Sequence, residues 1–267
     1  MNDRIDHDNT LRTTNQVFEQ IYQHASVRRY RPDPLPRATV EAIVAAGQRS
    51  STSSNLQMFS VVAVTDPDRR ARLAELCGAQ AHIAQAPVFL AWCADLSRLE
   101  RASELRGYTQ VSQYTENFLL AAVDTAIAMQ TATLAAESLG LGMCYIGAIR
   151  NHPLHVIELL ELPRLVFPIS GMTLGWPDGE HRTRPRLPLN AVLHWERYDA
   201  SDEEALLKVY DRVMAETDIY AGRQVAVPGK EGEMEDYGWS EHSARRVSEP
   251  KRVHLRAALA QQGFVLK

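Results

Sequence analysis

Residues 116–146, ENFLLAAVDTAIAMQTATLAAESLGLGMCYI, contain the longest helical pattern in the chain and the turn that ends it. Apolar or small side chains occupy nearly every face of the expected helix from Glu116 to Leu139, so this helix is expected inside a core or at a subunit interface. Gly140 and Gly142 are expected to end it, because glycine tolerates the backbone conformations that follow a helix. The next residues, 143–146, predict a short strand.

Further helices and strands are predicted on both sides of this stretch. A first helix carries Val17, Phe18, Ile21 and Tyr22, and further helices are expected at residues 37–48, 69–77, 156–160, 202–217 and 240–262. Strands are expected at residues 60–65, 87–94 and 166–176, and irregular loops at 181–188 and 222–238. Because helices alternate with strands through the first 176 residues, the chain is expected to have a mixed fold class.

Composition limits the kind of protein. The 267 residues include 29 Lys plus Arg and 33 Asp plus Glu, a balance that does not favour binding to nucleic acid or to a membrane surface. The polar residues 1–16 lack the apolar run of a signal peptide and are expected to form a flexible tail. The three cysteines match no metal-binding or disulfide pattern, so no metal site is expected.

No domain boundary or membrane span stands out in the remaining sequence. No apolar stretch approaches the roughly 20 residues of a membrane span without polar interruption. We therefore expect a cytoplasmic protein with small-molecule ligands. Residues 17–267 are predicted to form a single domain, with an excursion loop and C-terminal helix at about residues 200–262.

Two polar segments are candidates for binding a ligand. Residues 24–30, HASVRRY, bring guanidinium, imidazole and hydroxyl groups to the end of the first helix, which suits a ligand with phosphate and hydrogen-bonding ring edges. An ordinary basic turn that closes the helix is the alternative. Residues 50–57, SSTSSNLQ, form either a solvated linker or an ordered loop whose donors and acceptors encircle a polar ring or sugar chain.

Five motifs occur in an order that resembles the FMN-dependent nitroreductase family, specifically its NADPH-preferring branch. They are HASVRRY at 24–30, STSSNLQ at 51–57, GAQAH at 78–82, ESLGLGMCYIGA at 137–148 and RPRLP at 184–188. The resemblance covers roughly residue 17 to the C-terminus. It implies an α+β, nitroreductase-like fold, in which helices flank a central, mostly antiparallel sheet, and an intertwined homodimer with FMN sites at the subunit interface.

The resemblance also implies which residues bind FMN. His24, Ser26, Arg184 and Arg186 would hold the phosphate, and Arg28 would face the pyrimidine edge of the ring. Ala25 stands in this site where the family commonly has arginine. The other expected contacts are Thr52, Ser53, Ser54 and Gln57 from the second subunit, Gln80, and a strip beside the ring formed by Tyr145, Ile146, Gly147 and Ala148. Ala148 replaces a usual glycine, which a negative φ would tolerate.

The implied activity is that of an NADPH-dependent FMN oxidoreductase that reduces nitroaromatics, quinones or flavins. Hydride would pass from NADPH to bound FMN and then to an acceptor in ping-pong order, with no catalytic side chain. Arg223 would bind the 2′-phosphate of NADPH, and Asn55 and Arg252 would line the acceptor pocket. Two alternatives are a flavin reductase that supplies reduced FMN to a monooxygenase and a non-catalytic flavin-binding protein.

Overall fold

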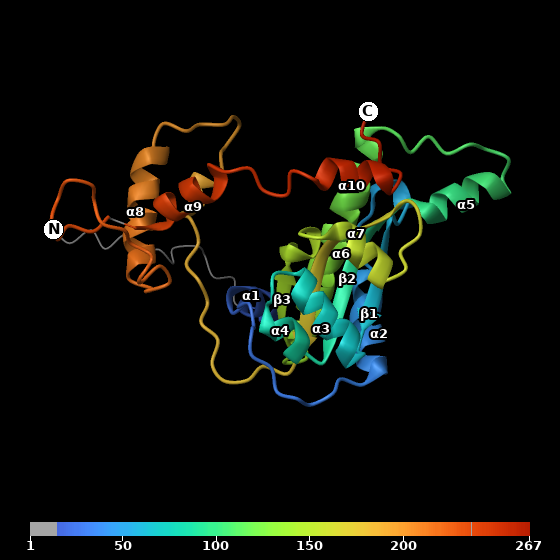
Figure 1. Cartoon of the computed structure of the whole chain (residues 1–267), viewed down its shortest axis with the longest axis horizontal. Helices are drawn as coiled ribbons and strands as arrows, with labels where there is room; N and C mark the ends of the chain where they lie inside the picture. Colours follow the sequence, from blue (N-terminus) through green and yellow to red (C-terminus); the bar gives the residue numbers. More distant parts are fainter. Residues whose placement is uncertain (1–14, 236) are drawn as a thin grey trace. The chain divides into compact units, whose positions relative to one another are not determined.

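The computed structural model describes residues 15–235 and 237–267, which divide into two compact units (Figure 1). We call residues 15–183 and 252–267 the sheet unit, and residues 184–251 the excursion unit. Whether residues 17–267 form a single domain stays a prediction.

The sheet unit is built on four antiparallel strands, β1 (Phe59–Val64), β2 (Val88–Asp95), β3 (Gly142–Ile146) and β4 (Val166–Gly175), in the order β1-β2-β4-β3. The central strand β2 is buried along its whole length. Its side chains alternate between two apolar clusters, with Phe89 in one and Trp92 in the other, because successive strand residues point to opposite faces. Both faces of the sheet are therefore covered.

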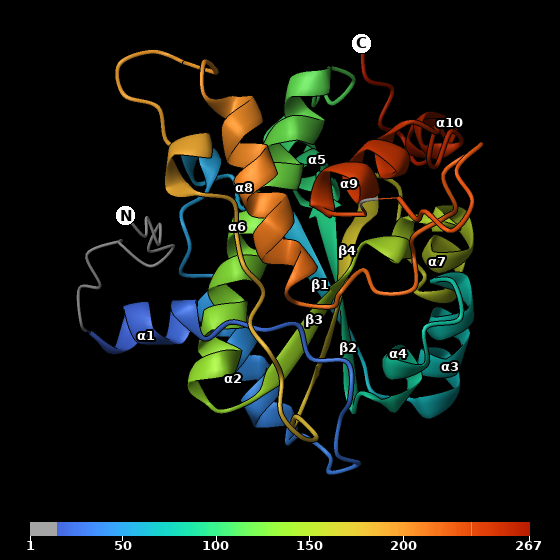
Figure 2. The same ribbon diagram turned by 90° about the vertical axis from the view of Figure 1, so that its left-hand side faces the viewer.

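Helices supply the two covering layers (Figure 2). On the face that carries Trp92 lie α2 (Arg37–Gly47) and α6 (Thr115–Ser138). On the face that carries Phe89 lie α3 (Pro67–Leu76), α4 (Ala81–Gln85) and α7 (Pro153–Leu159). The predicted α+β class, with helices flanking an antiparallel sheet, is confirmed.

Five further helices and three 3₁₀ turns complete the part of the chain that the structure describes. The sheet unit also contains α1 (Gln16–Tyr22), α5 (Ser97–Leu105), α10 (Leu255–Gln261) and the 3₁₀ turns η1 (Ser53–Asn55) and η2 (Gly147–Arg150). The excursion unit contains η3 (Leu189–Ala191), α8 (Glu203–Ala215) and α9 (Trp239–Val247). Of the predicted N-terminal tail, residues 1–14 lie outside the described residues, whereas Asn15 caps α1 by accepting hydrogen bonds from the Val17 and Phe18 N–H groups.

One predicted helix is wrong and two helices were not expected. The segment 240–262 forms two helices, α9 and α10, in place of one continuous helix. Pro250 lies between them; it has no N–H to donate and disfavours helical backbone at Glu249. The short helices α4 and α5 were not predicted. The strands and the other helices agree with the sequence interpretation to within a few residues.

Among the described helices, α6 is long and apolar enough to span a membrane by length and composition. In the structure, however, Asp124, Thr125 and Thr133 of this helix are buried, and Ala128 and Ala132 belong to the apolar cluster that includes Trp92. We interpret α6 as a core helix of the sheet unit, because core helices meet the same criteria.

Cys77 and Cys93 are expected to resist iodoacetamide in the native chain at about pH 8 and at about pH 9. Both side chains are fully buried, and burial raises the pKa of each thiol to about 12, so the reactive thiolate stays rare. Peptide mass spectrometry measures the labelling, and the unfolded chain, in which both thiols react, is the control. Labelling of either residue in the native chain that increases over this pH range would contradict the prediction.

Candidate active site

The segment 24–30 lies along the edge strand β3. Ser26 forms a parallel bridge with Met143, and the Val27 N–H donates to the Met143 carbonyl at 2.8 Å. Gly142 permits this close approach, because a Cβ at its position would lie 2.5 Å from Val27 Cγ2. The segment thus lies beside the strand that contains Tyr145 and Ile146.

Within this segment, Val27 and Tyr30 face the core, whereas Arg28 and Arg29 between them are both exposed. Val27 and Tyr30 are buried, and the Tyr30 hydroxyl donates to the Val27 carbonyl at 2.7 Å and lies 2.7 Å from Thr173 Oγ1. Arg28 is exposed, and no carboxylate in residues 15–235 or 237–267 forms an ion pair with it. Its guanidinium is therefore available to an anionic or hydrogen-bonding ligand.

The charge of Arg28 also affects His82 of α4. Burial lowers the pKa of His82, and the nearby Arg28 lowers it further, so the imidazole is neutral at physiological pH. His82 Nε2 is buried and has no hydrogen-bond partner among the described residues. Gln80, at the start of the same helix, donates from Nε2 to the Cys77 carbonyl at 2.7 Å, which leaves its side-chain oxygen free to accept.

His24 is held by a residue of α6. Its Nδ1 lies 2.5 Å from Glu137 Oε1, and this contact fixes the orientation of the imidazole. Only Nε2 is then left to contact a phosphate. Glu137 lies in one of the quoted motifs, but its pairing with His24 joins residues 113 positions apart and was not predicted.

The strip at residues 145–148 spans the last two residues of β3, Tyr145 and Ile146, and the first two of η2. The Tyr145 hydroxyl lies 2.6 Å from Thr133 Oγ1 and donates to Gln130 Oε1 at 2.8 Å, so its ring is fixed against α6. Gly147 and Ala148 begin η2, and neither has a positive φ. Ala148 therefore meets the backbone condition under which alanine is expected to be tolerated in place of glycine.

The serine loop, residues 51–57, is tied to α6 by Asp124. The carboxylate accepts hydrogen bonds from Thr52 Oγ1 at 2.5 Å, from the Ser53 N–H at 3.0 Å and from the Met58 N–H at 3.3 Å. Asp124 is only 2% exposed. This role of Asp124 was not predicted from the sequence. An acid within an otherwise apolar helix does indicate a hydrogen-bonded group, because a buried carboxylate requires partners.

The serine loop and the segment 24–30 attach to different parts of α6. Asp124, which holds the loop, and Glu137, which holds His24, lie 13 residues apart on this helix. At about 1.5 Å of rise per residue, the two attachment points are about 20 Å apart along the helix axis.

Arg252, predicted to line the acceptor pocket, lies beside η2. Its Nε donates to Asn151 Oδ1 at 2.9 Å. Burial lowers the pKa of Arg150, and the charge of Arg252 nearby lowers it further, so two guanidiniums lie close together next to the 145–148 strip. Asn55, the other predicted acceptor residue, lies in the serine loop with a φ of 56°.

In the excursion unit, the three predicted cofactor-binding arginines lie near one aromatic cluster that includes Tyr210 and Tyr220. Burial raises the pKa of Tyr210, and the charges of Arg186 and Arg184 partly offset this effect. Arg223 lies with its Cζ 5.7 Å from the centre of the Tyr220 ring and its Nη1 3.4 Å from His242 Nδ1. His242, which stacks on Tyr220, was not predicted from the sequence.

Comparison with known proteins covers nearly the whole chain. Residues 21–176 match the model of the nitroreductase family, and residues 184–267 match the model of its C-terminal domain. The chain belongs to the nitroreductase family.

Relatives of this nitroreductase-family chain include flavin and nitro-compound reductases. It is 40% identical over 253 residues to FMN reductase [NAD(P)H] of Bacillus subtilis, covering 94% of this chain and 98% of that protein. It is 37% identical over 251 residues to the oxygen-insensitive NADPH nitroreductase of Salmonella typhimurium, covering 94% and 99%. A solved NADPH:FMN oxidoreductase from Vibrio harveyi, complexed with NAD+, superposes with a TM-score of 0.83 at 32% identity, covering 95% and 100%.

The donor groups of this nitroreductase-family chain fit FMN chemically. A dianionic phosphate calls for cations, and the pyrimidine edge of the ring calls for a hydrogen-bond donor; the outward guanidinium of Arg28 and the fixed imidazole of His24 are groups of these kinds. The hydroxyl and amide groups of the serine loop suit a ribityl chain. The individual FMN contacts remain predictions.

Proposed function

We propose that this chain is an NADPH-dependent FMN oxidoreductase that reduces nitroaromatic compounds, quinones or flavins. The observation that carries the proposal is the exposed guanidinium of Arg28, which has no carboxylate partner among the described residues. The segment that carries it pairs with β3, the strand that contains Tyr145 and Ile146. The relatives named as flavin and nitro-compound reductases support the same activity. Bound FMN would accept hydride from NADPH and deliver it to the acceptor.

Each predicted contact then has a role in holding FMN. His24, Ser26, Arg184 and Arg186 would bind the phosphate, with Glu137 orienting the imidazole of His24. Arg28 would donate to the pyrimidine edge, and Gln80 would accept or donate at the ring or ribityl edge. Backbone groups at 145–148 would lie along the ring, where small residues such as Gly147 and Ala148 allow close approach.

We further propose that a second copy of the chain completes each FMN site. The serine loop and the segment 24–30 attach about 20 Å apart along α6, so loop residues of one copy are suited to the site of the other. Leu119, Val123 and Ile127, one turn apart along α6, are large apolar side chains exposed in the single chain, as are Val17 and Ile21 of α1. Sedimentation of the FMN-loaded protein is expected to give about twice the 29.9 kDa chain mass.

A cytoplasmic flavin reductase that donates reduced FMN to a monooxygenase is a second candidate within the same chemistry. The relatives named FMN reductase favour it. Steady-state kinetics with NADPH and a panel of nitroarenes, quinones and free FMN distinguishes the two candidates. Parallel double-reciprocal lines are expected for any true acceptor, and an absence of turnover with every acceptor would leave only a non-catalytic flavin-binding protein.

Arg223→Ala is expected to raise the KM for NADPH about 10- to 100-fold, because loss of a charge-assisted contact to the 2′-phosphate costs about 1.5–3 kcal/mol. The KM for NADH, which lacks this phosphate, is expected to change less than about threefold. Arg212→Ala removes another exposed arginine of the excursion unit and serves as the control. Equal effects of Arg223→Ala on the two nucleotides would remove Arg223 from the proposed site.

A further inference from the structure

Gln57 closes the serine loop in a conformation that is unfavourable for its residue type. Its φ is 52°, in the left-handed region where a side chain crowds the backbone. Its N–H donates to Thr52 Oγ1 at 2.9 Å, and its carbonyl accepts from Arg98 Nη1 at 2.8 Å. Both backbone groups of Gln57 are therefore held by side chains.

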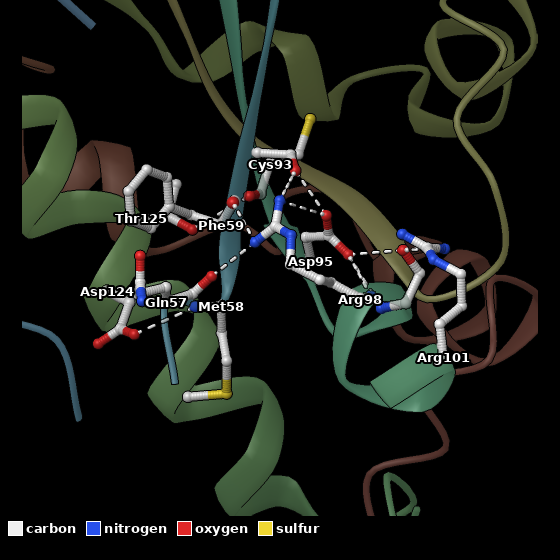
Figure 3. Close-up of polar contacts among 11 residues, drawn as sticks. Gln57, Met58, Phe59, Cys93, Asp95, Arg98, Arg101, Asp124 and Thr125 are labelled. Atoms are coloured by element: carbon white, nitrogen blue, oxygen red, sulfur yellow. Dashed lines mark hydrogen bonds and ion pairs between the residues drawn. The ribbon is translucent and has the colours of Figure 1, made fainter. Parts of the chain in front are cut away.

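Arg98 of α5 links the end of the loop to the start of β1 (Figure 3). The same Nη1 lies 3.3 Å from the Phe59 carbonyl, and Nη2 donates to Ser60 Oγ at 2.9 Å. The planar guanidinium is suited to several such contacts at once. Since the side chain remains about half exposed, Arg98 lies at the rim of the sheet unit and not in its core.

A buried carboxylate holds Arg98 in this position. Asp95 is 4% exposed and accepts hydrogen bonds from Ser60 Oγ at 2.5 Å and from Ser97 Oγ at 2.7 Å, while its Oδ2 lies 3.4 Å from Arg98 Nη2. Burial alone would raise the pKa of Asp95, but these hydrogen bonds and the charge of Arg98 lower it overall. Asp95 is therefore ionised at neutral pH and attracts the guanidinium.

We propose that Arg98 is a positioning residue for FMN binding, which holds the Gln57 backbone in its left-handed conformation so that the serine loop is preordered for the cofactor. The inference rests on the proposed function, because it takes FMN as the ligand. Arg98 does not need to touch FMN. Its contribution is to reduce the ordering that the loop must undergo when FMN binds.

The test is a double-mutant cycle on FMN affinity with Arg98→Met, Gln57→Gly and the double variant. The dissociation constant for FMN is measured by the quenching of FMN fluorescence, with samples kept in the dark between readings. Thermal unfolding is recorded for each FMN-free protein. Arg98→Met is expected to weaken FMN binding about tenfold, as loss of a charge-assisted hydrogen bond can do. In the Gln57→Gly background the same change is expected to weaken binding less than about threefold, because glycine adopts a positive φ without support.

Arg101→Met is the matched control, since Arg101 lies on the same helix and donates to Ser97 Oγ at 3.3 Å but has no contact with the serine loop. Its FMN affinity is expected to stay within about twofold of the unsubstituted protein. If Arg98→Met does not fold, the cycle is run with Arg98→Lys, which retains the charge without the planar fork. Equal weakening in both backgrounds overturns this inference, whereas failure of the unsubstituted protein to bind FMN overturns the proposed function.

Discussion

Replacing Asp124 with alanine is expected to lower the free energy of unfolding by about 3–5 kcal/mol, because each lost hydrogen bond to a charged group is worth about 1.5–3 kcal/mol. The substitution leaves Thr52 Oγ1 and two backbone N–H groups, those of Ser53 and Met58, without their acceptor. It also leaves a space in α6 at a position that is 2% exposed. Urea denaturation followed by circular dichroism measures the change.

The same substitution is expected to weaken FMN binding about tenfold or more, because the serine loop loses its attachment to α6. Glu116→Ala, an exposed acid at the start of α6, is the control and is expected to change stability by less than about 0.5 kcal/mol. Asp124→Asn retains one acceptor oxygen and is expected to give an intermediate loss. A loss below about 1 kcal/mol for Asp124→Ala would contradict the assigned role of the carboxylate.

Arg28→Met is expected to raise the dissociation constant for FMN about 10- to 100-fold, which corresponds to the loss of a charge-assisted contact worth about 1.5–3 kcal/mol. The methionine retains an apolar stem but no donor. Because Arg28 is exposed and pairs with no described carboxylate, its replacement is expected to leave stability within about 0.5 kcal/mol. Fluorescence titration of FMN measures the affinity.

Arg29→Met is the matched control for this prediction. Arg29 is the adjacent residue of the same type, and its carbonyl accepts a hydrogen bond from the Asp178 N–H at 3.1 Å, a backbone contact that the substitution retains. FMN affinity is expected to change less than about threefold in this variant. If the two substitutions weaken FMN binding equally, the cation at position 28 has only a general electrostatic effect, and its proposed contact with the pyrimidine edge is wrong.

Local sequence patterns were sufficient to predict most of the sheet unit. Val88, Phe89 and Leu90 belong to a continuous apolar run, which is typical of a strand covered on both faces. The glycines at 140 and 142 indicate where α6 ends. The sequence predicts one helix at residues 240–262 because the helical pattern resumes after Pro250, whereas the structure ends α9 before this proline and begins α10 after it. Short helices such as α4 give too few turns for periodicity to be seen.

The sequence predicts which segments form the candidate site, but not the residues that hold these segments in place. Motif order identified the segment 24–30, the serine loop and the 145–148 strip as parts of one kind of site. The residues that hold the segment 24–30 and the serine loop are Glu137, Asp124 and Arg98, and each acts across at least 41 positions of sequence. Such pairings depend on how helices pack, which periodicity does not report. The positive φ at Gln57 was equally hidden, because glutamine carries no signal for that conformation.

The most direct test of the proposed function is an anaerobic titration of the FMN-loaded protein with NADPH. The absorbance of oxidised flavin at about 450 nm is expected to be lost after about one equivalent of NADPH and to return when a quinone or nitroarene is added. Arg223→Ala is expected to require a higher NADPH concentration for the same loss. Flavin absorbance that persists at saturating NADPH in the FMN-loaded protein would contradict the proposed reductase activity and indicate a non-catalytic flavin-binding protein.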